Sequence, residues 1–168
     1  MPDPTALWTI ETVPWDDERA AALRDAMDAE VSPRYADRLD DISDEQAERI
    51  GAALGIDPDS IVATIVATDA DARPVGHAAL RDLGLSGALE VKRVFVDPGA
   101  RGSGVSRALM AELERIAVAE GAGRLILQTG DRQPDAIALY EKIGYTRIPI
   151  YPPYLDISFS HCFEKSVA

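Results

Sequence analysis

The sequence predicts a single α/β domain built around one mixed sheet, and three observations lead to this fold class. The chain has 168 residues, which is enough for one domain with one core. Apolar residues make up 46% of it and charged residues 27%, as in ordinary globular proteins. Residues 89–127 have the pattern of a strand, a helix and a second strand, and such a helical crossover makes the two strands parallel.

The N-terminal part predicts one strand followed by two helices. Polar and apolar side chains alternate over residues 7–13, which is typical of a strand. Asp16 and Asp17 can cap a following helix and favour its positive end. The apolar residues with helical spacing in that helix are Ala20, Leu23, Met27 and Val31. Ser43 and Gln46 have the spacing of a capping box, which predicts that a second helix begins there.

The rest of the chain predicts three strands, a helix, a strand, a helix and two last strands. The expected strands are residues 60–68, 75–83, 89–96, 125–127, 145–151 and 157–163. Val105, Leu109 and Leu113 share one face of the first of these helices. The second helix begins at Pro134, where a missing N–H costs nothing, and ends at Gly144.

Composition excludes several classes of protein. The net charge of −12 argues against binding a nucleic acid or an anionic membrane through a broad surface. Cys162 is the only cysteine, which excludes an intrachain disulfide and a multi-cysteine zinc site. No stretch reaches the roughly 18 apolar residues of a membrane span, and residues 1–15 lack the pattern of a secretion signal. We therefore expect a cytoplasmic protein without a nucleic-acid or membrane partner.

The loop over residues 97–104 predicts a phosphate site. Its glycines let the backbone approach a bulky anion, and the helix that follows directs free N–H groups and a positive dipole end toward it. The Walker pattern is absent. The dinucleotide fingerprint fails as well, because Arg107 stands where the third glycine is needed after Gly102 and Gly104. ATP and NAD are therefore disfavoured.

Two stretches resemble one family. Residues 101–106, Arg-Gly-Ser-Gly-Val-Ser, resemble the signature Arg/Gln-x-x-Gly-x-Gly/Ala of the GNAT superfamily of N-acetyltransferases, with Ser106 in place of the last Gly or Ala. Residues 133–145 resemble its Asn-x-x-Ala-x-x-Leu-Tyr-x-x-x-Gly-Phe, with Gln133 for Asn and Tyr145 for Phe. The two motifs stand in the family's order, and the resemblance covers roughly residues 60–145 and loosely the single domain of residues 1–168.

This resemblance implies a fold and a cofactor. The sheet would be mostly antiparallel, flanked by helices, with a central parallel pair of strands that splay apart, and acetyl-CoA would lie with its pantetheine arm between them. The backbone of Val94, Phe95 and Val96 would bind that arm. The implied pyrophosphate-binding residues are Arg101, Gly102, Ser103, Gly104, Val105, Ser106 and Arg107. The second motif would add Gln133, Ala136 and Tyr140.

The resemblance also implies a reaction, transfer of the acetyl group to a primary amine of a small molecule or peptide in a ternary complex. A protonated amine is no nucleophile, so a base is needed, and Glu90 matches the glutamate that serves as base in some members. Tyr140 would protonate the leaving thiolate, and a backbone N–H of residues 94–96 would stabilise the oxyanion. The mechanism needs no metal and no covalent intermediate. The acceptor stays open, and a homodimer is one option, since dimers are common in this family.

Several alternatives remain beside these assignments. The protein could be a non-catalytic acyl-CoA-binding sensor or a small-nucleotide-binding module. Tyr140 could be a core aromatic residue and Glu90 a solvated strand residue. Lys92 and Arg93 are expected at the surface or in ion pairs.

Three further residues and one segment have structural interpretations beside functional ones. Cys162 and His161 are neighbours on one expected strand, so their side chains point to opposite faces and packing is expected for Cys162. Packing is also expected for His77, which lies in the middle of a strand. The segment Tyr151-Pro-Pro-Tyr154 could line an acceptor pocket or pack against a partner chain.

Overall fold

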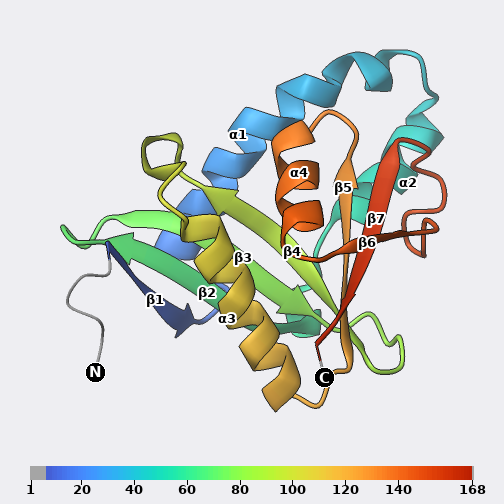
Figure 1. The fold of residues 1–168 in the computed structure, drawn as a ribbon. Coiled ribbons are helices and arrows are strands. Elements are labelled where there is room, and N and C mark those ends of the chain that lie inside the picture. Colours follow the sequence, from blue (N-terminus) through green and yellow to red (C-terminus); the bar gives the residue numbers. More distant parts are fainter. Residues whose placement is uncertain (1–6, 168) are drawn as a thin grey trace.

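One sheet of seven strands organises the structure, a computed structural model that describes residues 7–167 (Figure 1). The strands are β1 (Trp8–Val13), β2 (Ile61–Asp69), β3 (Pro74–Arg81), β4 (Ala88–Val96), β5 (Arg124–Gly130), β6 (Thr146–Ile148) and β7 (Ser160–Ser166). Their order in the sheet is β1-β2-β3-β4-β5-β7-β6. All neighbours pair antiparallel except β4 and β5, which are parallel. The predicted mixed, mostly antiparallel α/β sheet is confirmed.

Helices cover both faces of this sheet. Among residues 7–167 the α-helices are α1 (Glu18–Asp40), α2 (Asp44–Leu54), α3 (Val105–Ala119) and α4 (Pro134–Lys142). Figure 1 shows α3 and α4 on the near face and α1 and α2 on the far face. The predicted caps are present: the Asp17 side chain accepts the N–H groups of Arg19 and Ala20, and Ser43 and Gln46 form the capping box. None of these helices is long and apolar enough to cross a membrane.

The main core lies between the sheet and the helix pair α3 and α4. Leu109, Leu113 and Leu125 are fully buried there. Gly76 in β3 lets α3 approach closely, because a Cβ at this position would lie 2.9 Å from side-chain atoms of both Val105 and Leu109. A smaller core of Val13, Ala20, Leu23, Val66 and Phe95 lies under α1. The two faces of the sheet are thus fixed to different helices, and α1 is held by far less apolar surface than α3.

The last two strands differ from the prediction. We expected strands over residues 145–151 and 157–163, whereas β6 covers only Thr146–Ile148 and β7 runs from Ser160 to Ser166. Pro149, Pro152 and Pro153 lack the N–H that a strand needs, so β6 ends early. Strand β7 runs further because it pairs along the whole of β5. The expected single domain and the expected lack of a secretion signal include residues 1–6, which lie outside the described residues, as does residue 168 of that domain.

Candidate active site

A cavity of about 950 Å³ passes between β4 and β5. It is lined on the far face of the sheet by α1 and α2 and on the near face by α4. The strand residues in its wall are Val91, Lys92, Arg93, Val94, Gln128, Thr129 and Gly130. A cavity can reach both faces of a sheet only where two neighbouring strands part.

The strands do part at this point. Strands β4 and β5 are paired only at Ala88–Arg124, Leu89–Leu125 and Glu90–Ile126, and the pairing ends there although both strands continue. From Val91 onward the β5-facing edge of β4 therefore lacks a strand partner within residues 7–167. Such an edge presents backbone N–H and C=O groups to whatever fills the gap. An extended polar ligand fits it by the same hydrogen bonds that join strands.

A bulge in β4 adjusts the direction of this edge. In the pairing with β3, His77 faces Phe95 but Ala79 faces Lys92, so β4 holds one more residue than β3 between these pairs. Arg93 takes a positive φ of 56° in the bulge. The carbonyl of Arg93 lies 2.7 Å from Nδ1 of His77, whose Nε2 lies 3.1 Å from a guanidinium nitrogen of Arg24. Because a guanidinium can only donate, Nε2 accepts and Nδ1–H donates to the bulge carbonyl.

The end of β4 leads into the glycine loop and the start of α3. Gly102 and Gly104 both have positive φ, 82° and 88°, and Gly104 is the N-cap residue of α3. It contributes no side-chain cap, so the first N–H groups of α3 are not satisfied by a cap. The loop and helix start therefore have the geometry of an anion site. Arg101 turns toward the protein instead, because its guanidinium bonds the Val96 carbonyl at 3.0 Å and pairs with Glu30 at 2.6 Å.

Helix α4 forms the opposite wall of the cavity. Gln133, Ala136 and Tyr140 follow one another along the side of the helix that lines it. Tyr140 is 7% exposed and packs beside Tyr145 and Phe163. Its hydroxyl has no hydrogen-bond partner within residues 7–167, although the side chain borders the cavity. Burial raises the pKa of this hydroxyl well above its usual value, so Tyr140 keeps its proton at neutral pH.

A cluster of five polar residues, here the Glu90 cluster, lies beside the cavity. It consists of Arg81, Glu90, Lys92, Tyr151 and Tyr154. The Glu90 carboxylate is fully buried and accepts from Arg81 Nε at 2.7 Å, Tyr154 at 3.1 Å and Tyr151 at 2.6 Å. Lys92 Nζ donates to the Tyr154 hydroxyl at 2.8 Å. Of these five residues, only Lys92 also lines the cavity.

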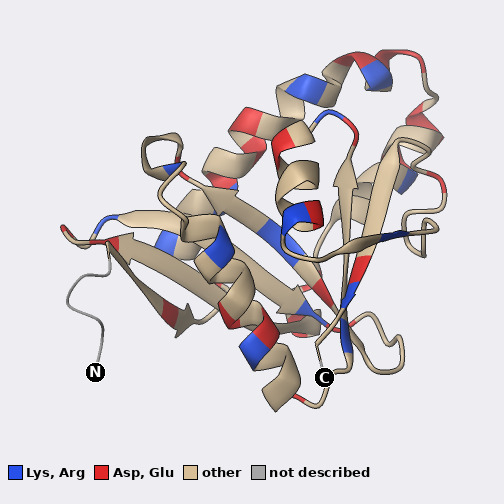
Figure 2. Ribbon diagram, viewed as in Figure 1, with Lys and Arg blue, Asp and Glu red and all other residues tan. Residues whose placement is uncertain are grey.

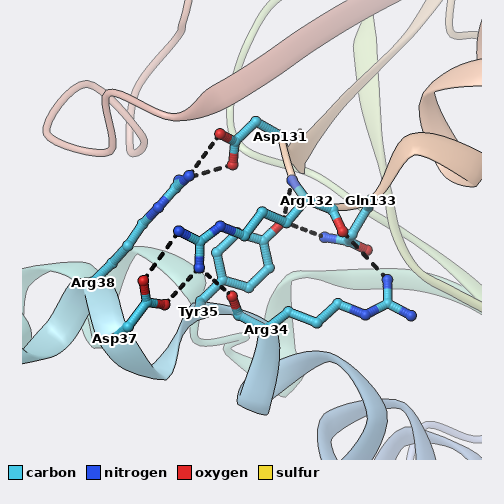
Figure 3. A network of polar contacts seen from close by, with 7 residues as sticks. All are labelled: Arg34, Tyr35, Asp37, Arg38, Asp131, Arg132 and Gln133. Carbon is cyan, nitrogen blue, oxygen red and sulfur yellow. Dashed lines mark hydrogen bonds and ion pairs between the residues drawn. The ribbon is translucent and has the colours of Figure 1, made fainter.

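The C-terminal half of α1 closes one side of the cavity, and Figure 3 shows how it is held to the loop after β5. Arg38 bonds both carboxylate oxygens of Asp131 at 2.8 and 2.7 Å, and Arg132 bonds those of Asp37 at 2.5 and 3.1 Å. The hydroxyl of Tyr35 accepts the backbone N–H of Arg132 at 3.0 Å. Two separate segments of the chain therefore form this wall as one polar network.

Gly130 makes that arrangement possible. A Cβ on Gly130 would lie only 2.1 Å from the hydroxyl oxygen of Tyr35, so any other residue would displace the tyrosine. Tyr35 also stacks on Phe159 with ring centroids 5.5 Å apart, and both rings line the cavity. Acidic and basic segments are interspersed along α1 (Figure 2), and Asp28 of this helix pairs with Arg93 at 2.5 Å. Ion pairs thus hold α1 in place, since its apolar contacts with the sheet are few.

Comparison with known proteins identifies the family. The profile of the Acetyltransferase (GNAT) family matches residues 8–145. The chain belongs to the GNAT acetyltransferase family. It is 45% identical over 76 residues to an IAA acetyltransferase of Azospirillum brasilense and 36% identical over 93 residues to the streptothricin acetyltransferase of Streptomyces lavendulae. These matches cover 45% and 55% of this chain and 50% and 48% of the relatives, so the chain spans about half the length of the curated relatives.

A solved structure agrees with the family over the full chain. A candidate acyl-CoA N-acyltransferase from Klebsiella pneumoniae is 29% identical, with a TM-score of 0.76 over 98% of this chain and 100% of that one. The GNAT resemblance of the two motifs and the fold class that it implied are therefore confirmed. The residue roles that the resemblance implied are not tested by these likenesses and stay predictions.

The structure brings some of the predicted GNAT site residues to one place and not others. Val94, Gln133, Ala136 and Tyr140 line the cavity. Phe95 and Val96 are buried in the two different cores, and only their backbone could take part. Residues 101–107 lie at the end of β4, outside the described cavity wall. Glu90 is not a solvated strand residue, because it is fully buried in the Glu90 cluster.

Lys92 corrects a prediction. We expected a surface or ion-pair residue, whereas Lys92 is 7% exposed and its described partner is a neutral hydroxyl. A charged residue in a strand is usually solvated, which is why the sequence misled us. The signal was present, since Glu90 and Lys92 are two residues apart and must share a face of β4. Arg93, by contrast, forms the expected ion pair.

The remaining expectations concern packing. Cys162 is 1% exposed while His161 is half-buried, so the two do point apart and Cys162 packs as predicted. His77 is fully buried, also as predicted. Tyr151 and Tyr154 do not line the described cavity, and their hydroxyls bond Glu90 instead. Their distance from Glu90 in the sequence hid this role. Packing of this segment against a partner chain stays a prediction.

Proposed function

We propose that this GNAT protein transfers the acetyl group of acetyl-CoA to a primary amine of a small molecule or peptide by direct attack in a ternary complex. The observation that carries the proposal is the cavity between β4 and β5, which has Tyr140 in its wall. Strand β4, which forms one side of the cavity, leads into the uncapped start of α3. The relatives named for acetyl transfer to streptothricin and to IAA support an enzyme over a sensor. The acceptor would enter from the side of α1 and α2, opposite the cofactor.

The cofactor assignment fits the open backbone of this site. The β5-facing edge of β4 offers the peptide groups of residues 94–96 to the pantetheine arm, which carries amides of its own. The glycine loop and the first N–H groups of α3, residues 102–107, would hold the pyrophosphate. Arg101 would bind a phosphate only by leaving Glu30, with which it pairs at 2.6 Å. Gln133 and Ala136 would border the arm on the side of α4.

The reaction follows from the residues around the gap. The free amine attacks the thioester carbonyl, so that a C–N bond forms and the C–S bond breaks. A backbone N–H of residues 94–96 stabilises the oxyanion. Tyr140 gives its proton to the leaving thiolate and regains one from solvent. Since burial keeps Tyr140 protonated, it is suited to donate and not to accept.

Glu90 is proposed as the final acceptor of the amine proton, through a hydroxyl. The half-buried Tyr151 donates to the Glu90 carboxylate at 2.6 Å. It can pass this proton to Glu90 while it takes one from a water that connects it to the acceptor, since Tyr151 itself lies outside the described cavity wall. Tyr151→Phe removes the hydroxyl and keeps the ring, so we expect a lower kcat with an unchanged Kd for acetyl-CoA. An unchanged kcat would contradict this relay.

Calorimetric titration with acetyl-CoA, with CoA, NAD and ATP as comparisons, tests the cofactor assignment. We expect binding of acetyl-CoA and CoA but not of the nucleotides. Thiol release in the presence of a panel of primary amines then tests turnover. Acetyl-CoA binding without amine-dependent thiol release would support a non-catalytic sensor instead, and a folded protein that binds no acetyl-CoA would refute the proposal.

A further inference from the structure

Lys92 places a positive charge in the wall of the cavity without a carboxylate of its own. The two neighbouring cations are paired, since Arg81 bonds Glu90 at 2.7 Å and Arg93 bonds Asp28 at 2.5 Å. Lys92 has the Tyr154 hydroxyl as its described partner, at 2.8 Å, and no ion pair within residues 7–167. An ammonium group has three N–H donors, so two remain for another acceptor.

Burial makes such a charge costly. Lys92 is only 7% exposed, and desolvation lowers its pKa to about 8, although Glu90 nearby opposes this effect. The group is therefore still mostly charged at neutral pH. A buried charge is stable when it is paired and hydrogen-bonded, and the Glu90 carboxylate already accepts three bonds from other groups. A bound anion would supply the missing partner.

The position of Lys92 separates it from the phosphate site. It precedes Val96 by four residues, which is about 13 Å along a strand, and the glycine loop lies beyond Val96. It precedes Val94, whose backbone is proposed to bind the pantetheine arm, by only two residues, or about 7 Å. An anion at Lys92 is thus too far from the loop to be the cofactor pyrophosphate and close enough to belong to the acceptor.

From this geometry we infer that Lys92 binds a carboxylate of the acceptor, so that the substrates are amino acids or similar amines with a carboxylate close to the reacting nitrogen. This inference rests on the proposed function and adds the class of acceptor. The same positive charge disfavours the protonated form of an amine near it, which helps to present the free amine for attack. Lys92 acts in binding and specificity and does not touch the reacting bond.

Paired acceptors test the inference. The twenty common α-amino acids are compared with the corresponding amino acid amides, which keep the shape and lose the negative charge. We expect wild type to prefer the acids. Lys92→Met should raise KM for the acids by on the order of tenfold to a hundredfold relative to KM for the amides, because one charge-assisted bond to the carboxylate is lost. Comparing the two proteins on each acceptor cancels the different basicity of the acceptors themselves.

Two further variants control for charge and structure. Lys142→Met removes the same charge from the exposed end of α4, outside the described cavity wall, and should leave the preference for acids intact. Lys92→Arg keeps the charge and should retain part of the preference. Thermal unfolding of each variant checks that the fold is intact.

The outcomes separate this inference from the proposed function. Equal loss with acids and amides in Lys92→Met would overturn it, as would a wild type that acetylates other primary amines but none of the amino acids. Absence of thiol release with any amine would refute the proposed function instead. In that case, calorimetric titration of the protein–CoA complex with amino acids and their amides still decides the inference: selective binding of the acids that Lys92→Met removes would support it, and no selective binding would overturn it.

Discussion

Tyr140 and its neighbour Tyr145 are chemically alike but differ in the surroundings of their hydroxyl groups. Tyr140 borders the cavity, whereas the Tyr145 hydroxyl is buried without a hydrogen-bond partner in the described part of the chain. Burial raises the pKa of both hydroxyls. Access from the cavity to the hydroxyl, and not its acidity, therefore distinguishes the proposed acid Tyr140 from the core residue Tyr145. The two tyrosines are a matched pair for mutation.

Tyr140→Phe is expected to lower kcat by about a hundredfold or more, which is the range of general acid catalysis. The Kd for acetyl-CoA should change little, because the ring remains in place. Tyr145→Phe should leave kcat unchanged and keep or raise the free energy of unfolding, since it removes an unsatisfied buried hydroxyl. Steady-state kinetics and calorimetry measure both effects. A similar loss of kcat in the two variants would show that the loss comes from altered packing and not from a missing proton donor.

His77 makes stability depend on pH. Its pKa is lowered to about 4 by burial, against 6.5 for an ordinary histidine. Above about pH 6.5 the imidazole is neutral in the folded and the unfolded chain. As the pH falls from 6.5 toward 4, the unfolded chain takes up a proton that the folded chain excludes, so the free energy of unfolding falls by roughly 3 kcal/mol. The positive charges of Arg24 and Arg93 act in the same direction.

The variant His77→Asn tests this dependence. Its side-chain N–H can still bond the Arg93 carbonyl, but the residue does not titrate. Urea unfolding at pH 7.5, 6 and 5 should show a steep loss of stability in wild type and a shallow one in the variant. The carboxylates with lowered pKa, such as Glu30 and Asp37, contribute mainly below about pH 4. Parallel curves for the two proteins over this range would exclude His77 as the source.

At the scale of elements, the glycine loop and helix α3 work as one unit. Gly104 ends the loop with a φ of 88° and begins the helix as its cap. Gly121, just after the other end of α3, has nearly the same φ of 83°. Nothing lies within 4 Å of a Cβ at Gly121, and at Gly104 only the ring of Trp8 does. An alanine thus introduces similar backbone strain at both positions, but only at Gly104 does its side chain lie beside the predicted phosphate site.

Gly104→Ala should therefore weaken acetyl-CoA binding about tenfold, whereas Gly121→Ala should not. Both variants are expected to lose about 1–2 kcal/mol of unfolding free energy, because each forces a side chain into the left-handed region. Calorimetric Kd values together with urea unfolding separate the two effects. If the affinities of the two variants stay equal while their stabilities fall alike, the loop does not hold the pyrophosphate where we propose.

For the whole molecule, sequence patterns predicted those features of the fold that depend on residues close together in the sequence. Period-two strands, two caps and the crossover of residues 89–127 were sufficient for the sheet and its parallel pair. They could not predict the Glu90 cluster, because Tyr154 lies 64 residues from Glu90 and only the folded chain joins them. Nor could they predict the bulge at Arg93, which depends on register with β3. The charge of Lys92 was misleading, because a lysine in a strand is expected at the surface and only the folded structure shows that this one is buried in the Glu90 cluster.

The arrangement of the whole molecule also favours one of two kinetic mechanisms. Cys162 is the sole cysteine and is 1% exposed, and it is absent from the described cavity wall. Burial raises the pKa of its thiol, so the nucleophilic thiolate is scarce. The cavity of about 950 Å³, in contrast, is open to both faces of the sheet, so that an acyl donor and an amine can approach from opposite sides. Both observations favour direct transfer over an acetylated enzyme.

Initial rates with both substrates varied should therefore give intersecting double-reciprocal lines, as expected for a ternary complex, and not the parallel lines of a ping-pong reaction. Cys162→Ala should keep turnover, with a loss of stability of about 1 kcal/mol for the small cavity that it leaves. Intact-mass measurement after incubation with acetyl-CoA alone should show no acetyl adduct. Parallel lines together with an adduct that Cys162→Ala abolishes would assign the cysteine a covalent role and refute direct attack.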